Sequence, residues 1–127
     1  MRPTIVWPIL AALAAALLLA PTVAAKDGRD IRVAGTCSAS TTSKLKLSEE
    51  DGRIEVEFEV DQNRNGVRWG VVLFRNGTKV ASRAHVTRAP SGSFESRFVT
   101  GNRAGVDRFV ARATRSGEVC TARASIQ

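Results

Sequence analysis

The chain has 127 residues, a formal net charge of +7, one histidine, two cysteines and no tyrosine. With so few residues suited to acid–base or metal chemistry, the composition argues against an enzyme, a cofactor or a metal site. Aromatic residues make up 6% of the chain. That is too few for the stacking platforms that single-stranded nucleic acid needs, so nucleic acid is disfavoured as a partner.

The first 25 residues have the features of a secretory signal peptide. Arg2 supplies a positive charge at the start, and an unbroken apolar run extends from Ile9 to Ala20. A retained membrane anchor would need about 20 apolar residues, and the small residues before Lys26 suit signal peptidase. We therefore expect cleavage after Ala25 and no remaining transmembrane segment. The product would be a secreted domain over residues 26–127, extracellular or associated with the cell wall.

Alternating apolar and polar residues, the pattern of half-buried β-strands, recur through the rest of the chain, and no segment has a helical period. Ile31–Ala39 and Lys44–Ser48 are the first two predicted strands. The clearest strand is Ile54–Val60 (IEVEFEV), which places four apolar residues on one face and three glutamates on the other. Asp51-Gly52 predicts the turn that precedes it.

DQNRNG (Asp61–Gly66) follows, and its Asp, Asn, Asn and Gly match the first half of an EF-hand calcium loop. The twelfth position of such a loop is Val72 here, where the motif has a glutamate that binds calcium through both oxygens. Arg64 adds a positive charge inside the loop, and the flanking segments are predicted strands instead of helices. We therefore interpret DQNRNG as a connection between two strands.

A hairpin is predicted next, with Val67–Phe74 as its first strand and Asn76-Gly77 as a type I′ turn. Alternation gives the inward residues of its two strands: Val67, Trp69, Val71 and Leu73, then Val80, Ser82, Ala84 and Val86. On this assignment, Arg83 and His85 point outward.

The last predicted strands run through Phe94 and Phe98, over Arg108–Thr114, and over Val119–Ile126. Turns are predicted at Ala89–Gly92 and Ser116-Gly117. Seven or eight short strands in about 100 residues, with frequent turns, predict an all-β, two-sheet antiparallel sandwich.

Cys37 and Cys120 lie near the two ends of the predicted domain, both at inward positions of their strands. An even pair in an exported protein is expected to form a disulfide. A metal pair or a reactive thiol has no support, because no histidine or further cysteine accompanies either residue. Closing a loop of this size would stabilise the folded state by about 4–5 kcal/mol.

Local features resemble the immunoglobulin-like fold over nearly all of residues 26–127. Trp69 lies inward on a strand just before a hairpin, as the core tryptophan does in that fold. Gly105–Ala113 (GVDRFVARA) is similar to the G-x-D-x-Y-x-C-x-A run that leads into strand F, and the interval between the two leaves room for strands C′ and E. The resemblance implies an immunoglobulin-like sandwich with Trp69, Phe109 and Phe58 in its core.

The chain departs from that pattern at three positions. Phe109 replaces the corner tyrosine, Ala111 replaces the second intersheet cysteine, and Val56 or Phe58 replaces the first. The resemblance thus implies an immunoglobulin-like domain whose disulfide has moved to the terminal strands. The phrases EVDQNRNG and TRAPSGSF are similar to those of small secreted, uncharacterised proteins of high-GC Gram-positive bacteria. That likeness implies secretion and a shared fold but no activity.

Charge divides unevenly along the predicted domain. Residues 26–61 contain six basic and nine acidic residues, whereas residues 62–127 contain twelve basic and three acidic residues. A basic half indicates an anionic partner. The alternative is a solvated surface that happens to be rich in arginine.

The strands equivalent to C, C′, F and G would form one sheet, and its outer face is the candidate partner face. Interface centres favour arginine and aromatic groups, and alternation assigns this face eight residues of arginine and apolar type: Arg68, Val72, Phe74, Arg83, Arg108, Val110, Arg112 and Arg123. The alternative is a solvated face with arginine side chains packed over Phe74.

The sequence therefore predicts a secreted, non-catalytic binding or adhesion module acting through this face. An anionic cell-envelope component or another protein would be the partner, and self-association is also open. The alternative is a structural or accessory envelope protein without a ligand of its own. An enzyme ranks third, because His85 is the only histidine and has no acid and serine arranged locally around it.

Overall fold

The computed structural model describes residues 30–127, so the predicted signal peptide over residues 1–25 lies outside the described residues. The described residues form nine strands: β1 (Asp30–Ala34), β2 (Thr36–Cys37), β3 (Thr42–Glu50), β4 (Arg53–Asp61), β5 (Arg68–Arg75), β6 (Thr78–Val86), β7 (Ser93–Gly101), β8 (Asp107–Arg115) and β9 (Glu118–Ile126). Residues 30–127 contain no helix that is long and apolar enough to span a membrane.

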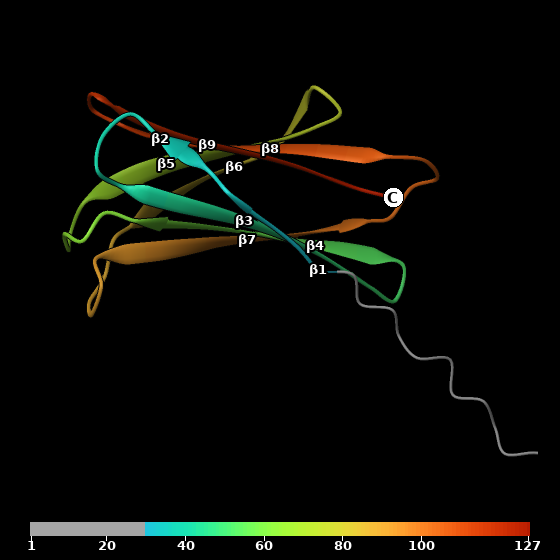
Figure 1. Cartoon of the computed structure of the whole chain (residues 1–127), viewed down its shortest axis with the longest axis horizontal. Coiled ribbons are helices and arrows are strands. Elements are labelled where there is room, and N and C mark those ends of the chain that lie inside the picture. The colour runs from blue at the N-terminus through green and yellow to red at the C-terminus, as the bar shows by residue number, and fades with distance from the viewer. Residues whose placement is uncertain (1–29) are drawn as a thin grey trace, which may run out of the picture.

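The strands form two antiparallel sheets, with the orders β1-β3-β4-β7 and β2-β9-β8-β5-β6. Figure 1 shows these sheets as two layers that face each other across the core. The predicted all-β, two-sheet antiparallel sandwich is confirmed. The four predicted strands that carry the candidate partner face are β5, β6, β8 and β9, and they do share one sheet.

The sandwich has nine strands instead of seven or eight, because the predicted strand Ile31–Ala39 divides at Gly35. Its first part, β1, pairs with β3 in one sheet, and its second part, β2, pairs with β9 in the other. Gly35 donates its backbone N–H to the Ser43 carbonyl oxygen at 2.9 Å, and a Cβ there would lie 2.9 Å from the Thr121 carbonyl oxygen. Only glycine lets the chain pass this closely between the two sheets.

The alternating residues of β3, β4 and β7 meet those of β5, β8 and β9 to form the core. Every second residue of β4 is fully buried, and Phe58 lies opposite Leu45 on β3. Trp69, Phe58 and Phe109 are the largest fully buried side chains. Removing a buried aromatic ring of this kind from a core costs about 3–5 kcal/mol.

Strand β6 is the one place where the predicted alternation is wrong. Lys79 lies opposite Phe74, but a β-bulge at Val80 then places Ala81 opposite Leu73. One extra residue moves every later side chain to the other face of the strand. Ala81, Arg83 and His85 therefore point inward, whereas Val80, Ser82, Ala84 and Val86 were predicted to do so.

The inward side chains of β6 close the open edge of the sandwich against β7. The Arg83 guanidinium lies 4.3 Å from the centroid of the Phe98 ring, and it donates to the backbone carbonyl of Arg97. His85 stacks on Phe94 with ring centroids 5.0 Å apart, and its Nε2 lies 2.8 Å from the hydroxyl of the buried Ser96. These polar groups fill a gap that would otherwise expose the core.

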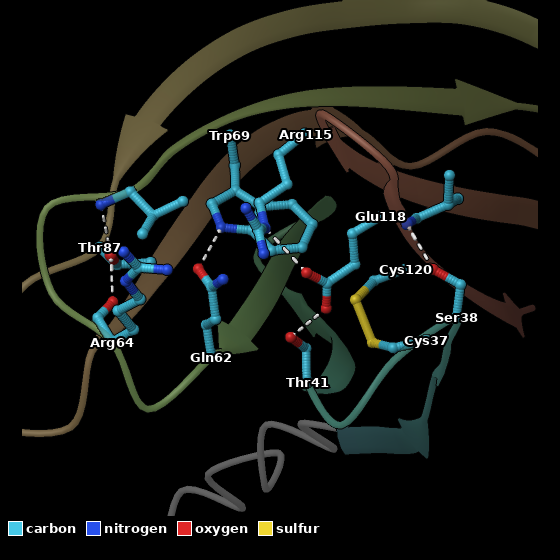
Figure 2. A network of polar contacts seen from close by, with 12 residues as sticks. Cys37, Ser38, Thr41, Gln62, Arg64, Trp69, Thr87, Arg115, Glu118 and Cys120 are labelled. Carbon is cyan, nitrogen blue, oxygen red and sulfur yellow. Dashed lines mark hydrogen bonds and ion pairs between the residues drawn. A yellow bond between two sulfur atoms is a disulfide. The ribbon is translucent and has the colours of Figure 1, made fainter.

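A buried polar network closes the end of the sandwich beside the disulfide (Figure 2). Glu118 accepts a hydrogen bond from the Thr41 hydroxyl and another, at 2.8 Å, from Arg115 Nε. The Arg115 guanidinium lies 5.7 Å from the Trp69 ring centroid, and Trp69 Nε1 donates to Gln62 Oε1 at 3.1 Å. The network therefore ties three connecting segments to the core tryptophan.

Cys37 and Cys120 form the predicted disulfide and lie directly opposite each other on β2 and β9. Strand β2 has only two residues, so the covalent bond supplies much of what holds it to the sheet. The disulfide thus joins the first strand of the second sheet to the last strand of the chain, as the sequence predicts.

DQNRNG connects β4 to β5, as predicted, and its polar groups bind the loop's own backbone. Asp61 Oδ1 accepts from the backbone N–H of Asn63 at 3.0 Å. The buried Thr87 hydroxyl donates to the Arg64 carbonyl oxygen at 2.6 Å and accepts from the Val67 N–H at 2.9 Å. The loop is held as a turn by Asp61 at one end and by Thr87 at the other.

Candidate functional site

The outer surface of the β2-β9-β8-β5-β6 sheet gathers basic side chains from four strands. Because side chains alternate along a strand, the residues between the buried ones all point outward from this sheet. We define the basic face as five cations and the three apolar residues that lie among them: Arg68, Lys79, Arg108, Arg112, Arg123, Val72, Phe74 and Val110.

Strand register fixes how these residues are arranged. Across one row, Arg123 lies opposite Val110, Val110 opposite Phe74, and Phe74 opposite Lys79. In the next row, Arg112 lies opposite Val72. The apolar side chains are therefore in the middle of the sheet, with cations on both sides of them.

The apolar centre is only half-buried. Val72, Phe74 and Val110 each retain part of their exposure, and neighbouring arginine side chains can pack along them. Two valines on β6, Val80 and Val86, are more open, with 48% and 43% of their surfaces exposed. The centre is thus a mixed surface in which half-exposed apolar side chains lie among cations.

The basic face lacks negative charge. Its sheet contains two acidic residues in the described part of the chain, Asp107 and Glu118, and both are buried. Within residues 30–127, none of the five cations forms an ion pair. The charge of this face is therefore available to an external anion.

The outer face of the other sheet is different, because four of its five cations are paired. Lys44 lies 3.6 Å from Glu59, and Lys46 lies 3.6 Å from Glu57 and 3.9 Å from Asp30. Arg32 and Arg97 are paired in the same way with Asp30 and Glu55. Within residues 30–127, the exposed Arg53 at the start of β4 is the one cation of this sheet without an ion pair. The two faces of the sandwich thus differ in the availability of their positive charge.

Arg83 does not belong to the basic face, although the sequence placed it there. The bulge at Val80 turns Arg83 inward, where it lies over Phe98. His85 was also predicted to point outward and instead packs between the sheets. Burial, followed by the charge of Arg83, lowers the pKa of His85 and favours the neutral imidazole. Lys79 replaces Arg83 on the face, and only the position of the bulge could have revealed this exchange.

The buried ion pair between Arg75, at the C-terminal end of β5, and Asp107 was not predicted. Arg75 Nε donates to Asp107 Oδ1 at 2.9 Å, and both side chains are almost fully buried. Arg75 Nη1 also donates to the Thr100 hydroxyl at 2.7 Å, and the guanidinium lies 5.5 Å from the Phe109 ring centroid. The sequence does contain an indication of it: Arg75 is in step with the inward-facing Trp69, immediately before the Asn76-Gly77 turn, so alternation places its side chain inward.

Within residues 30–127, no group of three or more His, Cys, Asp or Glu side chains is arranged to hold a metal ion. No protein-family model, curated protein or solved structure matches the chain. The arrangement of its own residues therefore carries the functional argument.

Proposed function

We propose that the chain is a secreted, non-catalytic binding module of the immunoglobulin-like class. It attaches to an anionic component of the cell envelope through the basic face. The proposal rests on one observation above all: five cations share a surface without a single carboxylate, and none of them forms an ion pair within the described residues.

Strand order supports the immunoglobulin-like class. The order β9-β8-β5-β6 corresponds to the order G-F-C-C′ of that class, and the pair β4–β7 corresponds to B–E. Trp69 on β5 and Phe109 on β8 then occupy the core positions that the resemblance implies. Within residues 30–127, the sandwich differs from the antibody type in having β1 and β2 at its N-terminal edge and no strand in the place of D.

Secretion is supported by the N-terminal sequence together with the disulfide. Arg2, the apolar run and the small residues before Lys26 are typical of a cleaved leader. The Cys37–Cys120 bond belongs to an oxidising compartment. We also propose that the protein comes from a high-GC Gram-positive bacterium. This rests only on the resemblance of the segments EVDQNRNG and TRAPSGSF to secreted proteins of that group.

Electrostatics and composition favour a polyanion over a neutral partner. Cations on a low-dielectric sheet surface raise the local concentration of counter-ions and speed the association of anions. Four of the five cations are arginines, whose planar forks form two hydrogen bonds with one anionic group. A neutral sugar or peptide could accept hydrogen bonds from these side chains but would gain no charge attraction.

The test uses protein purified from the medium of an exporting host and measures its co-sedimentation with cell-envelope material. The triple variant R68Q/R112Q/R123Q should reduce envelope affinity at low salt by at least about tenfold. R32Q/R53Q/R64Q is the matched control, because it also removes three positive charges, but from exposed positions away from the basic face.

Unchanged binding by the first variant would refute the proposal. It would then favour the alternative, a structural or accessory envelope protein without a ligand of its own. Equal losses in both variants would mean that net charge, and not this face, governs attachment. A concentration-dependent molecular mass that the first variant abolishes would instead assign the face to self-association.

A further inference from the structure

Three arginines of the basic face surround one valine. Arg123 on β9 lies directly opposite Val110 on β8, and Arg108 and Arg112 lie two residues to either side of Val110. Diagonal neighbours in an antiparallel pair lie about 7–8 Å apart. The backbone positions of Arg108 and Arg112 are therefore each about 7–8 Å from that of Arg123, a distance that long side chains can bridge above Val110.

A hollow adjoins this triangle on the side of β1. Arg108 and Arg123 line it together with Ile31, Val33 and Ala124, and its volume is about 480 Å³. Its walls are mainly apolar apart from the two arginines. A carbon segment attached to an anionic group would therefore find an apolar surface beside the guanidinium groups.

Building on the proposed function, we infer that Arg108, Arg112 and Arg123 form a subsite for the phosphate groups of a linear phosphodiester polymer with short carbon linkers. A carboxylate has two oxygens in one plane, and a single guanidinium fork occupies both. The two charged oxygens of a phosphodiester are attached to a tetrahedral phosphorus, and each accepts hydrogen bonds from several directions around its P–O bond, so forks from more than one side can reach them. Three convergent arginines suit the second geometry.

The observations favour a free polymer over a membrane surface. Val72, Phe74 and Val110 lie between cations and are half-buried, so they cannot enter a bilayer as the projecting apolar groups of membrane-binding surfaces do. Nucleic acid is disfavoured because Phe74 is the one aromatic residue on the basic face and is itself partly covered. A flexible polymer needs neither insertion nor stacking.

The experiment titrates the secreted protein with three probes at equal salt: poly(glycerol phosphate), polyglutamate of matched charge, and vesicles of phosphatidylglycerol and phosphatidylcholine. The first and third probes share their phosphate chemistry and differ in whether it is presented by a polymer or a membrane. The wild type should bind poly(glycerol phosphate) at least about tenfold more tightly than polyglutamate.

The variant R108K/R112K/R123K keeps every charge and loses the guanidinium forks. It should bind both polymers equally, with its polyglutamate affinity within about twofold of the wild type. R32K/R53K/R64K is the control and should keep the wild-type preference. Retention of the preference in R108K/R112K/R123K, equal wild-type affinities for the two polymers, or tighter binding to the vesicles would overturn the inference.

Failure of this inference is distinguishable from failure of the proposed function. If R68Q/R112Q/R123Q loses both polymers while the lysine variant behaves as the wild type, the face binds anions without selecting phosphate. If R68Q/R112Q/R123Q keeps both polymers, the basic face itself is not the binding surface. Thermal unfolding of each variant verifies that these exposed substitutions leave the fold intact.

Discussion

Replacing Asp107 with alanine should destabilise the domain more than any exposed substitution. Asp107 is the charged partner of Arg75, and their side chains are only 3% and 2% exposed. Without the carboxylate, the Arg75 guanidinium keeps the Thr100 hydroxyl and the Phe109 ring but loses its counter-charge. A buried cation without a counter-ion is among the costliest defects in a folded protein.

The expected loss is about 3–5 kcal/mol in the free energy of unfolding. For a domain of about 100 residues, each kcal/mol corresponds to about 4–8 °C in melting temperature. Asp107→Ala should therefore lower the melting temperature by at least about 12 °C. Asp107→Asn should cost less, because an amide oxygen can still accept the hydrogen bond from Arg75 Nε.

Urea denaturation of the oxidised protein measures these differences, since the disulfide must stay intact for a two-state analysis. Glu59→Ala removes the exposed Lys44–Glu59 pair and should change the free energy by less than about 1 kcal/mol. The double variant R75M/D107L should recover most of the stability, because it removes both charges together. A loss below about 1 kcal/mol for Asp107→Ala would refute the reasoning.

Two further predictions concern a loop glycine and the buried Glu118. Gly92 has a φ of +69°, and a Cβ there would lie 2.7 Å from the Arg64 carbonyl carbon; Gly92→Ala should therefore cost clearly more than Gly77→Ala, which has a φ of +82° but open space, by urea denaturation. Burial alone would raise the pKa of Glu118, but hydrogen bonds from Thr41 and Arg115 outweigh it and lower that pKa. This stabilisation is present above the ordinary value of 4.5 and is lost as the pH falls through the folded pKa. The wild type should therefore lose more stability than Glu118→Gln between about pH 5 and pH 2, and parallel pH profiles would contradict this assignment.

Period-two alternation predicted most of the fold because the core is made of β-strands with one face buried. Ile54–Val60 could hardly be anything but a half-buried strand, and Asn76-Gly77 turns the chain with both residues at positive φ, as a type I′ turn requires. Alternation failed on β6, where the sequence gives no sign of the bulge at Val80. Alternation also could not show that the chain passes from one sheet to the other at Gly35. That crossing depends on the close approach of the Gly35 backbone to Ser43 and Thr121.

The basic face was partly predictable, because the acidic and basic parts of the sequence contribute most of their strands to different sheets. The β2-β9-β8-β5-β6 sheet takes four of its five strands from residues 62–127, the basic part of the sequence. The other sheet takes β1, β3 and β4 from the acidic part, and β7 adds Arg97, which pairs with Glu55. Sheet topology therefore converts an uneven sequence into one face on which four of five cations are ion-paired and one basic face on which none is. The imbalance of charge can be counted along the chain, but only strand pairing determines that distant arginines, such as Arg68 and Arg123, share one surface.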